Sequence, residues 1–189
     1  IKRAVINEAI VHLSDKLFVN CFELETVVIG GAVETIGEEA FGKCTALETV
    51  VIPSNVTEIS DDAFLDANED VVIYCNEGSY AEQYAIANEI KYTTLVIDPI
   101  ENQVYTGEAI TPEVKASANN RRLTQDIEYT VSYKDNINAG SAKIIAKGLG
   151  DFKHLAATAK FTILPKGTEA VTVLDTGSVY NPKGVKPEI

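Results

Sequence analysis

A repeat of 23 residues constrains this chain more than any other feature of its sequence. Residues 17–37, LFVNCFELETVVIGGAVETIG, align with residues 40–60, AFGKCTALETVVIPSNVTEIS, without a gap. Phenylalanine recurs at the same spacing at Phe18, Phe41 and Phe64. An internal repeat of this length is typical of solenoids, in which each copy forms one coil.

Each copy contains a short apolar strand, ETVVI in the second copy, followed by a turn and a second apolar pair. One copy cannot bury its apolar side chains alone, whereas stacked copies bury a continuous core. The chain opens inside an earlier copy, so we expect it to be a piece of a longer protein. We expect the last copy to be two residues shorter, just before residues 71–73.

The copies resemble the leucine-rich repeats of the BspA type, whose unit reads AF-x-x-C-x-x-L-x-x-V-x-I-P-x-x-V-x-x-I. Residues 1–75 match this unit through nearly four coils. The resemblance implies a bacterial surface protein, and many members of that family are implicated in adhesion. In this frame Cys44 lies beside Cys21 in a ladder of small side chains, so we expect packing and free thiols rather than reactivity.

The repeat ends at CNEGSYAEQYAIANEIKY, residues 75–92. Ser79 and Glu82 have the S-x-x-E spacing of a capping box, which predicts a helix from about residue 80 to 88. The open end of a solenoid exposes its core, so we expect this helix to lie over the last coil.

Residues 92–165 change to a period of two, as in Tyr129, Val131 and Tyr133, with turn residues between short segments. This pattern predicts six or seven antiparallel strands in a small β-sandwich. Residues 179–189 repeat residues 104–114 at a distance of 75, so residues 166–189 are expected to be the first strands of a second, truncated module.

The segments YTGEAITP, IEYTVSYKDNINAGSAK, GLGDF and FTI resemble the Ig-like tandem repeats of Gram-positive surface proteins, which usually act as spacers or adhesive units. The expected fold is therefore mainly β with short helices. A leucine-rich-repeat solenoid with a C-terminal capping helix, residues 1–91, precedes an Ig-like antiparallel β-sandwich, residues 92–165. Residues 166–189 would leave unpaired strand edges, so we expect them to pair onto residues 93–165 or, by strand exchange, onto a second chain.

The charge of the chain excludes several classes of partner. Its formal net charge is −12, and all of the excess acid lies in residues 1–92, which hold 17 acidic and 5 basic residues. Such a surface repels nucleic acid and anionic lipid, and no apolar run is long enough to insert in a membrane.

No motif of a nucleotide, metal or catalytic site occurs, so we expect no enzyme activity, cofactor or bound metal. The acid pairs at residues 38–39, 61–62 and 69–70 are interpreted as a solvated face.

The outward face of the repeated strands is the expected binding surface for a host or neighbouring-cell protein. Its stacked valines would form an exposed apolar stripe, flanked by threonine and glutamate, although valine also simply favours strands. The residues of this face are Val5, Val28, Val51 and Val72, with Thr26, Thr49, Glu25 and Glu48.

The leading hypothesis is a non-catalytic adhesin or protein-recognition unit, extracellular and on the bacterial surface or secreted. A purely structural stalk and a carbohydrate-binding accessory region of a surface enzyme are the alternatives.

Overall fold

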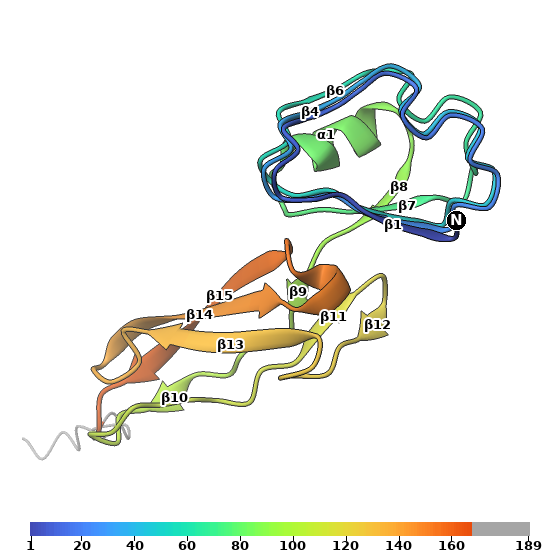
Figure 1. Cartoon of the computed structure of the whole chain (residues 1–189). Coiled ribbons are helices and arrows are strands. Elements are labelled where there is room, and N and C mark those ends of the chain that lie inside the picture. The colour runs from blue at the N-terminus through green and yellow to red at the C-terminus, as the bar shows by residue number, and fades with distance from the viewer. Residues whose placement is uncertain (168–189) are drawn as a thin grey trace, which may run out of the picture.

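The computed structural model describes residues 1–167 as a coiled N-terminal part, the solenoid (residues 1–93), joined to an elongated β module (residues 94–167) (Figure 1). The sequence predicts the first strands of a second, truncated Ig-like module at residues 166–189, with strand exchange as one expected pairing. Residues 168–189 are not described, so both expectations lie outside the described residues. None of the helices in the described part is long and apolar enough to cross a membrane.

Two parallel sheets run along opposite sides of the solenoid, and each coil contributes one strand to each sheet until the last. The first sheet has five strands, in the order β1 Arg3–Val5, β3 Thr26–Val28, β5 Thr49–Val51, β7 Val72–Tyr74 and β8 Lys91–Thr93. The second has three, in the order β2 His12–Leu13, β4 Thr35–Ile36 and β6 Glu58–Ile59. The solenoid sheet therefore continues to Thr93, two residues beyond the expected boundary.

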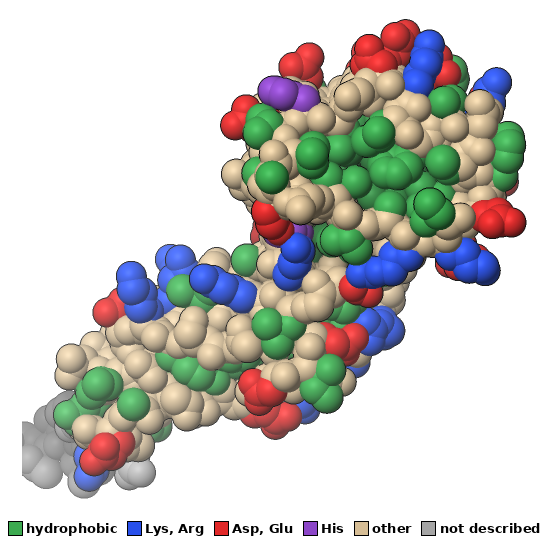
Figure 2. Space-filling model, viewed as in Figure 1, with side chains coloured by type: hydrophobic (Ala, Val, Ile, Leu, Met, Phe, Trp, Pro, Cys, Tyr) green, Lys and Arg blue, Asp and Glu red, His purple; other side chains and the backbone are tan. Residues whose placement is uncertain are grey.

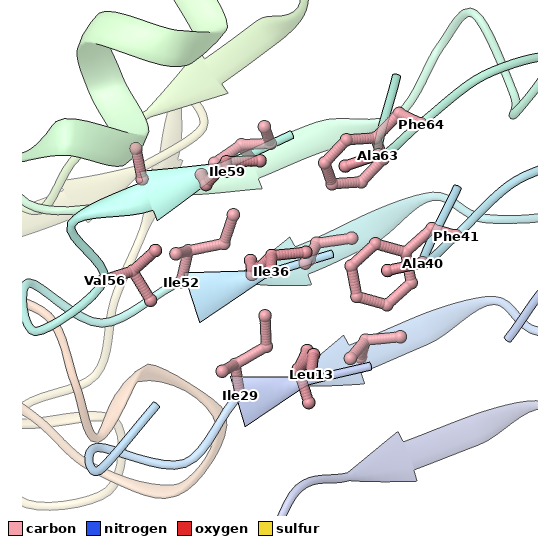
Figure 3. Close-up of a cluster of buried hydrophobic side chains, with 14 of the residues drawn as sticks. Leu13, Ile29, Ile36, Ala40, Phe41, Ile52, Val56, Ile59, Ala63 and Phe64 are labelled. Atoms are coloured by element: carbon pink, nitrogen blue, oxygen red, sulfur yellow. The ribbon is translucent and has the colours of Figure 1, made fainter. Parts of the chain in front are cut away.

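The repeated apolar residues form ladders inside the coils (Figure 3). Phe41 is wholly buried between Phe18 and Phe64, with ring centroids 5.7 and 5.1 Å apart. Leu13, Ile36 and Ile59 form a second ladder in the same core, shown in Figure 3. These ladders explain the 23-residue repeat, because each side chain packs on its equivalent in the next coil.

One part of the expected register is wrong. Val72 pairs with Thr49, Ile73 with Val50 and Tyr74 with Val51, which keeps the interval of 23 residues. The last copy is therefore not shortened at this point, and the residue in line with Val51 is Tyr74 instead of Val72.

The helix expected after the last coil is α1 Tyr80–Ala87. The Ser79 hydroxyl accepts a hydrogen bond from the Glu82 amide at 3.3 Å, and the Glu82 carboxylate accepts one from the Gly78 amide at 2.6 Å. These bonds satisfy amide groups that a helix start leaves unpaired. Ala81, Tyr84 and Ala85 are buried in the solenoid core, so α1 packs against the last coil.

Among the described residues the β module contains seven strands, within the expected six or seven, arranged in two sheets that share one hydrophobic core. Strands β10 Gln103–Val104, β15 Ala156–Leu164, β14 Gly140–Gly148 and β13 Tyr129–Lys134 form the first sheet in that order. The expectation of a wholly antiparallel module is wrong at one edge, because β10 pairs with β15 in parallel. Strands β12 Arg121–Arg122, β11 Ala116–Ala118 and β9 Val96–Ile97 form the second. The 3₁₀ helix η1 Gly150–Phe152 completes the module.

Candidate recognition surface

The outward side of the five-stranded sheet presents two rows of residues in register. One row runs through Val5, Val28, Val51 and Tyr74, and the other through Arg3, Thr26, Thr49, Val72 and Lys91. The sequence predicts Val5, Val28, Val51, Thr26 and Thr49 on this face. The observed register moves Val72 into the threonine row and puts Tyr74 beside Val51.

The β module covers the middle of the valine row. Val28 and Val51 are each 1% exposed, and both belong to the core cluster of the β module together with Leu95 and Leu155. Tyr74 packs on Phe152 with ring centroids 5.9 Å apart. The expected exposed stripe is therefore corrected: Val5 is 55% exposed and Val72 is partly exposed, whereas Val28 and Val51 attach the β module to the solenoid.

Polar contacts border this contact region, which we call the junction. The Asn76 amide group donates to the Ser54 hydroxyl at 2.7 Å and to the His154 carbonyl at 2.8 Å. Its carbonyl oxygen accepts from the Ala156 amide at 2.6 Å. Asn76 thus joins both modules with all three bonds satisfied, which fixes their relative position more specifically than apolar contact alone.

Glu8 forms a second bridge across the junction. Its carboxylate accepts hydrogen bonds from the Gly31 amide at 2.5 Å and the Lys153 ammonium group at 2.7 Å. Together they hold the pKa of Glu8 below its ordinary value, with the Lys153 bond the largest cause. Arg3 and Asp151 form a further ion pair at 2.6 Å. The side chains of Glu8, Arg3 and their partners are half-exposed, so such pairs stabilise only weakly.

The threonine row is the part of the strand face that remains accessible. Thr26, Thr49 and Val72 are each partly exposed. Glu25 and Glu48 precede them, and Glu25 pairs with Lys2 at 2.6 Å. The accessible face is therefore narrower and more polar than the sequence indicates.

Apolar side chains gather at the open N-terminal end of the solenoid. A hollow of about 460 Å³ is lined there by Ile1, Phe18, Asn20, Cys21, Phe22, Glu23 and Leu24. Figure 2 shows this part of the molecule as a broad hydrophobic region. This hollow was not among the sites expected from the sequence, although the apolar ladder positions of the first copies are the signal for it.

Carboxylates from neighbouring coils also meet. Single ligand atoms of Glu38, Glu39 and Asp62 lie within 4.8 Å of one another, a distance at which three carboxylates could hold a cation. Lys16 pairs with Glu39 at 3.5 Å and neutralises part of this charge. The sequence placed these residues on a solvated face, and two of the three are in fact partly buried.

The cysteines lie among packing residues. Cys44 is wholly buried and donates to the Phe18 carbonyl at 3.1 Å, and Cys21 and Cys75 are free as well. Burial raises the pKa of Cys44 and of Cys75 to about 11. Because the thiolate is the reactive form, this raised pKa keeps both thiols in the less reactive protonated form at neutral pH.

Comparison with protein families supports the repeat architecture. The model described as "BspA type Leucine rich repeat region (6 copies)" matches residues 1–99, more than half of the chain. The chain belongs to the BspA-type leucine-rich repeat family. Members of this family are typically non-catalytic and typically surface-exposed or secreted. Comparisons with curated proteins and with solved structures gave no match.

In this BspA-type repeat protein, the junction should weaken with acid because of His154. Nε2 of His154 is buried without a hydrogen-bond partner and lies 3.5 Å from a Glu8 oxygen. Burial, and then the positive charge of Lys153, lower the pKa of His154 from 6.5, although Glu8 opposes them. The docked state therefore binds fewer protons than the open state, and stability falls as pH drops below about 6.5.

We expect the free energy of unfolding to decrease between pH 7.5 and pH 5.5, and His154→Gln to reduce that decrease. Urea denaturation of both proteins at each pH measures it. The stabilisation from Glu8, whose pKa is lowered from 4.5, is lost only at more acidic pH and does not interfere. Equal slopes for the two proteins would contradict a role for His154 in this window.

Proposed function

We propose that this chain is a non-catalytic recognition unit of a bacterial surface protein, which binds a protein of the host or of a neighbouring cell. Membership of the BspA-type family, which suggests surface protein recognition, supports this function. The observation that carries it is the accessible row of Thr26, Thr49 and Val72, in register on three parallel strands. A flat row of short side chains at the regular spacing of a sheet favours contact with an extended protein surface.

In this proposal the β module is an Ig-like spacer and α1 is the cap of the solenoid. The alternating strands and the single core between two sheets support the first assignment. The burial of Ala81, Tyr84 and Ala85 over the last coil supports the second. The junction then holds the recognition face at a fixed angle to the spacer.

The test is adhesion of cells to surfaces coated with the purified chain. We expect mammalian epithelial or bacterial cells to adhere, and Thr49→Arg to reduce adhesion at least tenfold, because a long cation then covers the row. Thr45→Arg is the matched control, since Thr45 is exposed on the same copy but outside the strand. Treating the cells with protease should abolish adhesion to the wild-type chain.

Other outcomes would favour the alternatives. Adhesion that resists protease but is lost after removal of cell-surface glycans would indicate the carbohydrate-binding accessory region. The absence of adhesion by any cell type would favour a purely structural stalk. Equal effects of the two arginine variants would overturn the proposed face.

A further inference from the structure

Three lysines form a row across the outer face of the β module. Lys134 of β13 is directly opposite Lys143 of β14, which is directly opposite Lys160 of β15. Adjacent strands lie about 4.8 Å apart, so the row places three positive charges at short and regular intervals. Lys147 lies four residues further along β14, on the same face.

In the part of the chain that the structure describes, no acidic residue of the same sheet neutralises this row. The strands β13, β14 and β15 contain neither aspartate nor glutamate, and among the described residues no ion pair includes Lys134, Lys143, Lys147 or Lys160. Figure 2 shows the blue side chains gathered along this side of the module. Like charges directly opposite one another destabilise a sheet, so the arrangement favours binding of an anionic partner.

The solenoid carries the complementary feature. A hollow beside β4 and β6 is lined by Asp15, Glu38, Glu58, Asp61 and Asp62, and no lysine or arginine of residues 1–167 lines it. Asp15, Glu38 and Asp61 follow one another at the repeat interval of 23 residues. Parallel strands of successive coils have the same spacing as strands of the β module, so the acidic and basic rows match in period.

The two features cannot meet within one chain. In Figure 1, β4 and β6 lie on the side of the solenoid away from the β module. We propose that the lysine row of Lys134, Lys143 and Lys160 in one copy binds the acidic hollow around Asp15, Glu38 and Asp61 in a second copy. Because the two surfaces differ, each copy in a pair keeps one of them free, and the contact extends to further copies until the rotation between them closes a ring or a chain continues.

Salt should control this association in a specific way. Each copy has a net charge of −12, so the copies repel one another at long range. At about 0.1 M salt the screening length is about 10 Å, which suppresses that repulsion but leaves charge contacts in place. At about 1 M it is about 3 Å, and the contacts themselves weaken. At about 0.1 M salt, two copies therefore pair specifically only where complementary charges lie at contact distance.

The experiment is sedimentation velocity on the full chain over a range of concentrations. At about 0.1 M salt the average mass should rise with concentration, and at about 1 M it should return to the monomer. The row variant K134Q/K143Q/K160Q and the hollow variant D15N/E38Q/D61N should each remain monomeric. An equimolar mixture of the two should form pairs that do not grow further, because each variant supplies one intact surface.

The control K2Q/K43Q/K91Q removes three positive charges from the solenoid, as many as the row variant removes from the β module. It should associate as the wild type does. Wild-type chains that stay monomeric at about 0.1 M salt, or a control that loses association like the row variant, would overturn the proposal. The proposal would also be overturned if the wild-type chain stayed monomeric but bound immobilised polyphosphate through the lysine row. The row would then be a binding site for a polyanion. The proposal does not depend on the proposed adhesion.

Discussion

Replacing Phe41 with alanine is expected to lower the free energy of unfolding by about 3–5 kcal/mol. Phe41 is 0% exposed, and its ring is stacked between those of Phe18 and Phe64. Truncation removes the contacts of the ring with both neighbouring coils and leaves a cavity. The hydrogen-bonded backbones of the neighbouring coils prevent this cavity from closing. Because a solenoid coil is stabilised only by its neighbours, the loss also reduces coupling between the coils.

Urea denaturation followed by circular dichroism measures this loss. Phe22→Ala is the matched control, because Phe22 belongs to the first full copy but is 57% exposed. That change should alter the free energy of unfolding by about 0.5 kcal/mol or less. Similar losses for the two variants would mean that the phenylalanine ladder does not stabilise the solenoid through packing.

The solenoid could be predicted from the sequence because its stabilising contacts repeat. Each buried residue packs on its equivalent 23 residues away, so one alignment of the chain with itself identifies the core. The turns that close the coils could not be predicted in this way. Asn20, Lys43 and Asp66 occupy equivalent positions with φ of 62°, 57° and 54°, although only asparagine and aspartate commonly favour that conformation. The geometry of the coil, more than residue type, imposes it.

The candidate surface was only partly predictable, because the outward valines have the same local pattern whether solvent or another module covers them. Val5, Val28 and Val51 occupy equivalent positions in successive copies, yet of these three only Val5 is open. Burial of the other two depends on contacts with Leu155 and other residues more than 100 positions away. Asn76, whose three hydrogen bonds join the modules, aligns with Pro53 and Gly30 in the two preceding copies, so the repeat pattern does not mark it.

The lysine row was hidden for a different reason. Residues 93–189 contain equal numbers of acidic and basic residues, which indicates a neutral module. Lys134, Lys143 and Lys160 come together only through the register of three strands, and no interval in the sequence links them. The net charge of each module therefore predicts the acidic surface of the solenoid but not the local cluster of positive charge on the β module.

Replacing Val51 with lysine is expected to open the junction while both modules remain folded. Val51 is 1% exposed beneath the β module, and a charge introduced without a partner at such a site costs about 3–5 kcal/mol. The solenoid core need not bear this cost, because the side chain points outward and becomes solvated once the β module leaves. The cost is therefore limited to the free energy that holds the two modules together.

Val5→Lys is the matched control, because Val5 lies in the same row but is 55% exposed. Small-angle scattering should show a larger radius of gyration for Val51→Lys alone, and limited proteolysis should cleave that variant near Thr94. Circular dichroism should retain the β signal of both modules. An unchanged radius with retained stability would show that Val51 is not held in the junction. Equal expansion in Val5→Lys would show that added charge, rather than loss of buried contact, separates the modules.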